Sequence, residues 1–167
     1  FSIANAPTNS SLIELHVRQI ENGKFTNFVF NGLEEKSLLR IEGPKGDFFF
    51  REDSKKPVIL VAGGTGLGPI KSIIEHAITT KLNRKIYLYW GVRDEVDLYM
   101  DLPKQWAAEY DNIHFVPVLS EPNNAWQGRT GFVHESVLKD FDDLTGYEIY
   151  ACGPPEMVKS AANTFVD

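Results

Sequence analysis

The architecture of this chain can be inferred from one segment, Pro57-Val58-Ile59-Leu60-Val61-Ala62-Gly63-Gly64-Thr65-Gly66-Leu67-Gly68-Pro69-Ile70. Its first half is a continuous apolar run rich in β-branched residues, which is typical of a strand buried in a parallel sheet. Four glycines and a proline follow, and apolar residues then recur at helical spacing, at Ile70, Ile73, Ile74 and Ala77. A strand, a glycine loop and a helix in this order direct backbone N–H groups and a helix N-terminus at one point, which favours a phosphate.

Two well-known phosphate loops match this segment only in part. A P-loop ends in Gly-Lys-Ser/Thr, but here Pro69-Ile70 precedes Lys71-Ser72, so we reject that motif. The dinucleotide fingerprint G-x-G-x-x-G is broken by Pro69 at its third glycine, although a proline suits the first turn of a helix. The alternative is a tight strand-to-helix connection without a ligand, which the entropic cost of ordering four glycines disfavours.

The composition excludes several classes of function. The net charge of −6 argues against nucleic acid or an anionic membrane as a general partner, and no apolar run is long enough to span a bilayer. Because Cys152 is the one cysteine, the chain cannot form an internal disulfide or hold an iron–sulfur cluster by itself, and we expect a reducing cytoplasm. The four histidines show no ligand spacing, so we expect no metal site.

Residues 1–52 have the pattern of a β-domain. A short helix is expected within residues 23–32, and strands are expected at residues 1–5, 12–18, 38–42 and 48–50. The polar stretch 51–56 is the expected seam, which divides the chain into domains 1–52 and 53–167. The chain lacks an initiator methionine and opens on a strand-like segment, so we expect it to be truncated at both ends.

From Pro57 onward the pattern alternates between strands and helices. After the apolar run and the helix that follows the glycines, strands are expected at 86–91, 114–119 and 147–151, and helices at 98–110, 133–141 and 156–165. This alternation implies right-handed crossovers and therefore an α/β fold with a doubly wound parallel sheet.

In such a sheet a ligand binds beyond the carboxyl ends of the strands. The expected strands end on small or flexible residues, namely Gly63-Gly64, Gly91-Val92-Arg93, Ser120-Glu121 and Cys152-Gly153-Pro154. These strand ends leave room for a flat, extended ligand.

Seven short motifs in order carry a resemblance that covers essentially the whole chain. They are Phe1-Ser2-Ile3-Ala4-Asn5, Gly23-Lys24-Phe25-Thr26, Ile41-Glu42-Gly43-Pro44-Lys45-Gly46, Ala62-Gly63-Gly64-Thr65-Gly66, Tyr89-Trp90-Gly91-Val92-Arg93, Gly128-Arg129-Thr130-Gly131 and Cys152-Gly153-Pro154. Together they resemble the ferredoxin–NADP reductase-like superfamily, and within it the bacterial NAD(P)H-flavin reductases and the CDP-6-deoxy-3,4-glucoseen reductase group. In that superfamily an antiparallel flavin-binding β-barrel precedes an α/β domain that binds the nicotinamide nucleotide.

The resemblance implies a flavin side in the first domain. The family motif is Arg-x-(Tyr or Phe)-Ser, so Phe1 would pack on the flavin and Ser2 would bond near its N5 atom. The arginine of that motif would precede Phe1 and is absent from the chain, which leaves open whether this chain holds flavin. Gly23 and Thr26 match a second motif, Gly-x-x-Ser/Thr, in which a helix N-terminus and a hydroxyl face a pyrophosphate. The equal alternative makes Thr26 an ordinary helix cap.

The resemblance also implies a nicotinamide side in the second domain. Gly63, Gly64, Thr65 and Gly66 would cradle the dinucleotide, and Cys152 would lie against the nicotinamide C4 and the flavin N5. Gly153 and Pro154, which follow it, would also bind cofactor. Because no activating histidine is evident nearby, we expect Cys152 to shape the hydride path rather than to act as a nucleophile. Ser2 and Cys152 are thus the candidate catalytic residues.

Charge bears on the choice of coenzyme. Ser120 and Glu121 stand where NADPH would need a cation, and a carboxylate there would repel a 2′-phosphate. Arg93 and Arg129, which we expect close together, argue the other way, so NADH is favoured over NADPH only slightly. The acidic residues Asp140, Asp142 and Asp143 are interpreted as solvated surface.

These observations favour an oxidoreductase that passes hydride from NAD(P)H to FAD or FMN. Hydride transfer needs no general acid or base, and no such constellation is visible. Two alternatives stay open. One is an FAD-containing reductase component that feeds an iron–sulfur domain, an oxygenase or a deoxysugar system outside this chain. The other is a nucleotide-binding fragment without activity.

Overall fold

A five-stranded parallel sheet forms the centre of the computed structural model, which describes residues 1–8 and 11–166. The strand order is β4-β3-β2-β1-β5, and every neighbouring pair is parallel. The strands are β1 (Val58–Gly63), β2 (Ile86–Val92), β3 (Ile113–Leu119), β4 (Arg129–Thr130) and β5 (Glu148–Cys152). β1 therefore lies in the interior of the sheet, as its uninterrupted apolar sequence predicts.

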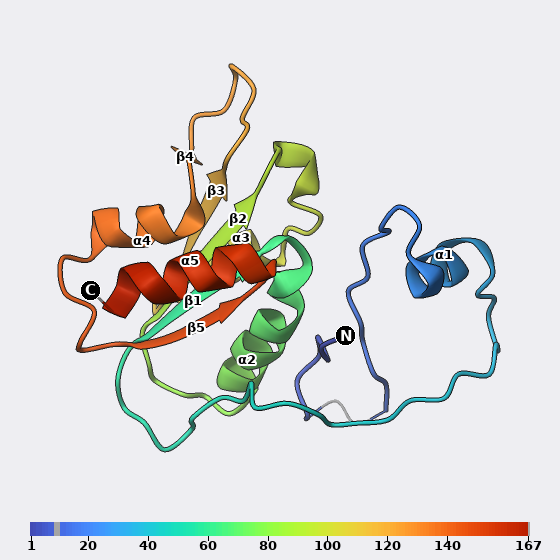
Figure 1. Cartoon of the computed structure of the whole chain (residues 1–167). Coiled ribbons are helices and arrows are strands. Elements are labelled where there is room, and N and C mark those ends of the chain that lie inside the picture. The colour runs from blue at the N-terminus through green and yellow to red at the C-terminus, as the bar shows by residue number, and fades with distance from the viewer. Residues whose placement is uncertain (9–10, 167) are drawn as a thin grey trace.

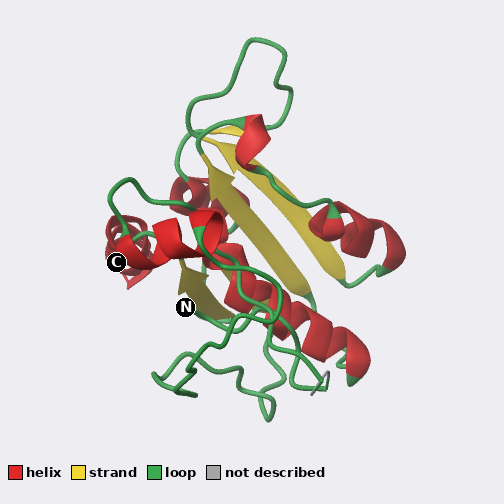
Figure 2. Cartoon of the chain, turned by 90° about the vertical axis from the view of Figure 1, so that its right-hand side faces the viewer, coloured by secondary structure: helices red, strands yellow, loops and turns green. Residues whose placement is uncertain are grey.

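Helices cover both faces of the sheet (Figures 1 and 2). They are α2 (Leu67–Thr79), α3 (Leu102–Glu109), α4 (Val133–Asp140) and α5 (Pro155–Val166). Alternate residues of β1 point to opposite faces: Leu60 packs in the core with α2 and α3, whereas Val61 packs in the core with α4 and α5. The prediction of a doubly wound α/β sheet is confirmed.

Two details of this domain differ from the sequence-based expectation. β4 has only two residues and was not predicted, because so short a strand carries no hydrophobic period. The helix expected over 98–110 is shorter: α3 begins at Leu102, and a separate 3₁₀ turn, η2 (Glu95–Asp97), precedes residue 98. Pro103 lies in the first turn of α3, where a proline is tolerated. In the interior of a longer helix the same proline would remove a backbone hydrogen bond, so the helix begins just before it.

Residues 1–8 and 11–50 form an open segment beside the sheet domain (Figure 1). The short helix is present as α1 (Lys24–Asn31), but the strands expected at 1–5, 12–18, 38–42 and 48–50 are not formed. Within the described residues of this segment, β-pairing is limited to one antiparallel bridge between Ile3 and Leu15. A strand needs a continuous ladder of hydrogen bonds to a neighbouring backbone, and one bridge is too short to form it.

Residues at the end of this segment pack on the sheet domain. The Phe48 and Phe50 rings lie 6.1 Å and 5.7 Å from that of Tyr150 on β5. The buried guanidinium of Arg84 donates to the carbonyl oxygens of Arg51 and Lys56 and pairs with Glu148 at 2.8 Å. The segment around the expected seam is therefore attached to the sheet domain at the amino end of its strands.

Candidate functional site

A cavity of about 350 Å³ opens at the carboxyl edge of the sheet. One wall comes from the N-terminal segment and holds Phe1, Ser2, His16 and Arg18. The opposite wall is the loop after β1, from Gly63 to Pro69, and the end of β5, from Cys152 to Pro154. The structure thus brings together, around one cavity, the expected flavin-side pair Phe1 and Ser2 and the expected nicotinamide-side residues Gly63, Gly64, Thr65, Gly66, Cys152, Gly153 and Pro154.

The glycines around this loop meet two different requirements, which are close packing against backbone and open space beside the backbone. A Cβ on Gly66 would lie 2.1 Å from the carbonyl oxygen of Cys152, and one on Gly153 would lie 2.9 Å from the Cα of Gly63. Those positions are glycine because β1 and β5 approach closely. Gly64 has φ +52°, and a Cβ there would meet no atom within 4 Å. Gly64 is therefore the open position of the loop, where a ligand can approach the backbone.

The Gly64 backbone is fixed from behind by a buried tryptophan. The indole N–H of Trp90 on β2 donates to the Gly64 carbonyl oxygen at 2.9 Å. Trp90 is fully buried, so this bond sets the orientation of the loop from the core of the sheet. The sequence motif around Trp90 did not indicate this role.

Cys152 is half-buried at the end of β5. Burial raises the pKa of its thiol, and a hydrogen bond from the Gly153 backbone opposes this only in part. The thiol is therefore neutral at physiological pH and a poor nucleophile, as the sequence analysis predicts.

A second cavity of about 580 Å³ adjoins the first at Gly63, Gly64 and Arg18. It extends past the ends of β2 and β3 and is lined by Arg93, Ser120 and the start of α4. The guanidinium of Arg93 donates to both carboxylate oxygens of Glu121, at 3.2 Å and 3.1 Å. The two residues expected to influence coenzyme choice therefore form one exposed ion pair.

Arg129, which the sequence analysis expects near Arg93, has a different partner. Arg129 is on β4 and pairs with Asp140 at the end of α4, and it does not line the cavity. Asp140 also accepts a 2.6 Å hydrogen bond from the Tyr89 hydroxyl. Although burial opposes its charge, these bonds hold the pKa of Asp140 below its usual value. Asp140 is nevertheless exposed, as are Asp142 and Asp143, so the three acidic residues lie at the surface as expected.

On the flavin side, Phe1 is 71 % exposed, and its ring lies 5.0 Å from that of Phe25. Thr26 does not act as a helix cap, because the N-cap of α1 is Gly23 and no side chain caps the first N–H groups of the helix. The buried Thr26 hydroxyl lies 3.2 Å from the Gly23 carbonyl oxygen, and it accepts a bond from the Ile20 N–H. Thr26 thus closes its own turn, and any contact of this turn with a phosphate falls to backbone N–H groups.

Arg18 and Phe132 are among the lining residues that the sequence did not indicate. Arg18 borders both cavities, and its guanidinium lies 3.8 Å from the Asp97 carboxylate. Phe132, which is 61 % exposed beside the second cavity, stacks on His134 at 5.8 Å. Phe132 follows directly on the Gly128–Gly131 motif, and that adjacency was the one signal available.

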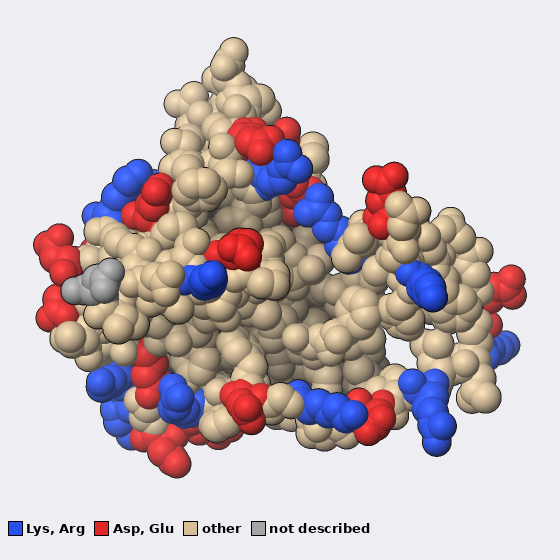
Figure 3. Space-filling view, viewed as in Figure 1, with Lys and Arg blue, Asp and Glu red and all other residues tan. Residues whose placement is uncertain are grey.

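The charge distribution and the search for other centres add two observations. On the face drawn in Figure 3, acidic and basic side chains are interspersed, with no field of a single sign. Within residues 1–8 and 11–166 we find no helix that could cross a bilayer and no His, Cys, Asp or Glu cluster suited to a metal ion.

Comparison with protein-family models gives two matches. Residues 60–163 match the oxidoreductase NAD-binding domain, and residues 1–50 match the oxidoreductase FAD-binding domain. The first match alone covers more than half of the chain.

Individual relatives agree with these models. The chain is 47 % identical to a CDP-6-deoxy-L-threo-D-glycero-4-hexulose-3-dehydrase reductase of Yersinia pestis over 100 % of this chain and 50 % of that protein. It is 40 % identical to a probable flavin reductase of Photobacterium leiognathi over 99 % of this chain and 73 % of that protein. The chain thus spans about half the length of some curated relatives and nearly three quarters of others.

A solved structure supports the fold over the whole chain. The cytochrome P450 reductase GcoB of Amycolatopsis superposes with a TM-score of 0.88 at 35 % identity, over 99 % of this chain and 51 % of that one. The similarity therefore includes the open N-terminal segment, which lies within the match to the FAD-binding model.

Proposed function

This chain belongs to the oxidoreductase NAD-binding domain family, in the ferredoxin–NADP reductase-like superfamily, and from that premise we propose that it passes hydride from NAD(P)H to a flavin. The observation that supports this proposal best is the cavity of about 350 Å³. Phe1 and Ser2 fall within the match to the FAD-binding model, and Thr65 and Cys152 fall within the match to the NAD-binding model. Both sets line the same space.

The residues present fit the two cofactors to different degrees. Gly64 offers open space at the backbone of a loop that begins a helix, which suits a dinucleotide. Phe1 and Ser2 suit the ring of a flavin, whereas the Thr26 hydroxyl is already bonded within its turn. We therefore assign Gly63–Gly66 and Cys152–Pro154 to the nicotinamide nucleotide, and Phe1, Ser2 and the backbone of Gly23 and Thr26 to the flavin.

Bound nicotinamide supplies the hydride in this reaction, and bound flavin accepts it. The residues of the protein orient the two cofactors and enclose the space between them. The Gly64 backbone is held by Trp90, and the neutral Cys152 thiol narrows the space between the two walls without competing as a base. Ser2 offers a hydroxyl donor on the opposite wall. None of these residues needs to exchange a proton with solvent, so the site can work by positioning alone.

We propose NADH as the preferred coenzyme. Arg18 and Arg93 line the second cavity together with Ser120, and the charge of Arg93 is engaged by Glu121. A 2′-phosphate would have to compete with that carboxylate, whereas ribose hydroxyls could bond to it.

The second candidate is a reductase component with tightly held FAD, which passes electrons on to an iron–sulfur domain or to an oxygenase or deoxysugar system. The half-length match to the Yersinia pestis dehydrase reductase favours it. In either case we propose domains at 1–52 and 53–167. We also propose a cytoplasmic location, because the half-buried Cys152 thiol is unpaired.

The test is a titration and a rapid-mixing experiment on the full-length protein. We expect NADH to bind more tightly than NADPH, and NADH to bleach the flavin in the absence of oxygen. A yellow protein on purification indicates the reductase component, whereas colourless protein that oxidises NADH only with added FMN or riboflavin indicates the flavin reductase. Binding of a nucleotide without reduction of any flavin would leave only the inactive fragment, and no binding of either nucleotide would refute the proposal.

A further inference from the structure

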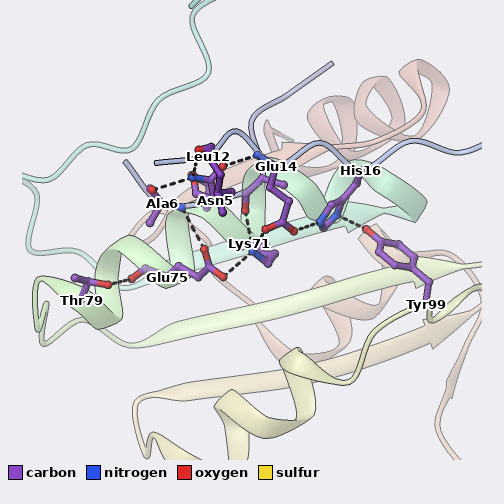
Figure 4. A network of polar contacts seen from close by, with 11 residues as sticks. Asn5, Ala6, Leu12, Glu14, His16, Lys71, Glu75, Thr79 and Tyr99 are labelled. Atoms are coloured by element: carbon purple, nitrogen blue, oxygen red, sulfur yellow. Dashed lines mark hydrogen bonds and ion pairs between the residues drawn. The ribbon is translucent and has the colours of Figure 1, made fainter. Parts of the chain in front are cut away.

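A buried lysine lies at the junction of the N-terminal segment and the sheet domain (Figure 4). Lys71 on α2 is 4 % exposed. Its ammonium lies 2.6 Å from a Glu75 carboxylate oxygen and 3.0 Å from a Glu14 carboxylate oxygen, and it donates to the Ala4 carbonyl oxygen at 3.2 Å. All three of its protons are therefore directed at oxygen atoms, and two of these oxygens belong to the N-terminal segment.

Further bonds along α2 hold the same stretch of chain. The Ala6 N–H donates to Glu75 at 3.1 Å, and the Ser72 hydroxyl donates to the Asn5 carbonyl oxygen at 2.9 Å. At the start of α2, Gly68 lies beside Ala4, since a Cβ on Gly68 would be 3.5 Å from that of Ala4, an ordinary contact distance. Residues 4–6 are thus fastened to α2, one residue after the pair Phe1-Ser2 that lines the cavity.

The network continues from Glu14 to the far side of the glycine loop. The two ring nitrogens of His16 lie 2.8 Å from a Glu14 carboxylate oxygen and 2.7 Å from the Tyr99 hydroxyl. The Tyr99 ring packs edge-on against Trp90, at 5.2 Å between centroids. Trp90 is the residue that holds the Gly64 carbonyl, so the chain of contacts runs from Lys71 around to the open position of the loop.

The contacts of this network favour the charged forms of Lys71 and Glu14. Burial opposes the charge of Lys71, but its bonds to Glu75 and Glu14 raise the pKa of the ammonium above its usual value. Burial likewise opposes the charge of Glu14, while bonds to His16 and Lys71 lower the pKa of its carboxyl. A buried ammonium between two carboxylates has few alternative partners, so it fixes geometry more than an exposed ion pair does.

We propose that Lys71 is a positioning residue for hydride transfer, which fixes the wall formed by Phe1 and Ser2 at its working distance from the glycine loop and Cys152. The inference rests on the proposed function, because it concerns the space between the two cofactors. Lys71 touches neither wall of the cavity itself; it acts through Ala4 and Glu14. Its loss should therefore affect the approach of the two cofactors rather than the binding of either one.

The experiment compares Lys71→Met with Arg84→Met in the full-length protein. Arg84 is an equally buried cation with its own carboxylate, Glu148, but it lies at the amino end of the strands, away from the cavity. Glu14→Gln is the milder variant, in case Lys71→Met does not fold, because it removes the ion pair to the N-terminal segment and leaves Lys71 paired with Glu75. For each variant, the rate of flavin reduction at saturating NADH, the isotope effect with NADH deuterated at C4, and the dissociation constants for NADH and flavin are measured.

We expect Lys71→Met to slow flavin reduction about ten- to a hundredfold, to change the isotope effect and to leave both dissociation constants within about twofold. Glu14→Gln should show the same pattern at smaller amplitude, and Arg84→Met should lose stability without slowing the transfer. A Lys71→Met or Glu14→Gln protein that transfers hydride at the wild-type rate would overturn the inference. So would equal slowing by Arg84→Met, since that would indicate general destabilisation.

Hydrogen exchange gives a readout that needs no cofactor. The Ala4 and Ala6 amides are bonded to Glu14 and Glu75, so Lys71→Met should speed their exchange while the amides of β1 stay protected. Unchanged exchange at residues 4–6 would show that Lys71 does not hold this segment, and would overturn the inference. A wild-type protein that reduces no flavin would instead refute the proposed function, and the inference with it.

Discussion

At the scale of single residues, the loop after β1 combines strict packing with one open position. Gly66 lies against the Cys152 carbonyl, and Gly64 faces free space at φ +52°. These requirements are separable by mutation, because the first concerns the contact of β1 with β5 and the second concerns access of a ligand to the backbone.

Gly66→Ala should destabilise the fold by about 3 kcal/mol, because its new methyl would lie 2.1 Å from a backbone oxygen that cannot move without shifting β5. Urea unfolding at neutral pH measures the loss. Gly146→Ala is the matched control, since a Cβ there meets no atom within 4 Å, and we expect a change within about 0.5 kcal/mol. Equal stability of the two variants would contradict the close approach of β1 and β5.

The ion pair of Arg93 and Glu121 gives a prediction about coenzyme choice. Glu121→Gln removes the carboxylate and leaves the guanidinium free to bond a 2′-phosphate, so the ratio of kcat/KM for NADPH to that for NADH should rise about tenfold. Steady-state kinetics with both coenzymes measures the ratio, and the exposed Glu35→Gln variant serves as control. An unchanged ratio would show that this strand tip does not meet the adenosine end of the coenzyme.

At the scale of elements, α4 is fastened to the sheet through its last residue. Asp140 accepts from Tyr89 on β2 and pairs with Arg129 on β4. A carboxylate at the carboxyl end of a helix opposes the helix dipole, so these two partners offset an unfavourable placement.

Asp140→Asn should therefore lower the free energy of unfolding by about 2 kcal/mol at pH 7. The folded pKa of Asp140 is depressed, so its contribution is fully present above the unfolded pKa of about 3.9 and is lost as the pH falls through the lower folded value. The difference between wild type and variant should thus shrink below about pH 4. Urea unfolding at several pH values measures it, with the exposed Asp142→Asn as control; a difference independent of pH would argue against an ionised Asp140 in the folded state.

The sequence predicted the elements whose pattern is internal to them. The strands β1, β2, β3 and β5 and the helices between them follow from apolar runs and helical spacing. β4 was missed because its two residues pair with β3 only through tertiary contact. The strands expected before residue 50 failed because alternation predicts a face to be buried but not whether a neighbouring backbone is present.

Part of the candidate site could also be predicted from the sequence. Strand ends in a parallel sheet meet at one edge, so the residues of Gly63–Gly66 and Cys152–Pro154 could be brought together from the pattern alone. The pairing of Arg129 with Asp140, and the network from Lys71 to Tyr99, depend on which side chains meet across elements. No local pattern in the sequence predicts these contacts between side chains of different elements.

At the scale of the whole molecule, the N-terminal segment and the sheet domain are joined at both ends of the sheet. Lys71 and Glu14 join them near the carboxyl edge, and Arg84 with Phe50 joins them near the amino edge. Phe50 packs on the core of the sheet domain, with the Arg84 guanidinium 5.0 Å from its ring centroid. The expected boundary at residues 52 and 53 stays a prediction, and these contacts argue that the stability of the sheet domain depends on residues before it.

Phe50→Ala and Phe49→Ala test this dependence with adjacent, identical residues. Phe50 packs on the core, whereas Phe49 is 67 % exposed. We expect Phe50→Ala to lower the free energy of unfolding of the sheet by about 2 kcal/mol and Phe49→Ala to change it by less than about 0.5 kcal/mol. Circular dichroism during urea unfolding measures both. If Phe50→Ala leaves the unfolding transition of the sheet unchanged, the sheet domain is independent of residue 50 and the boundary at 52 stands; if it shifts the transition as expected, the unit that folds cooperatively begins at or before Phe50.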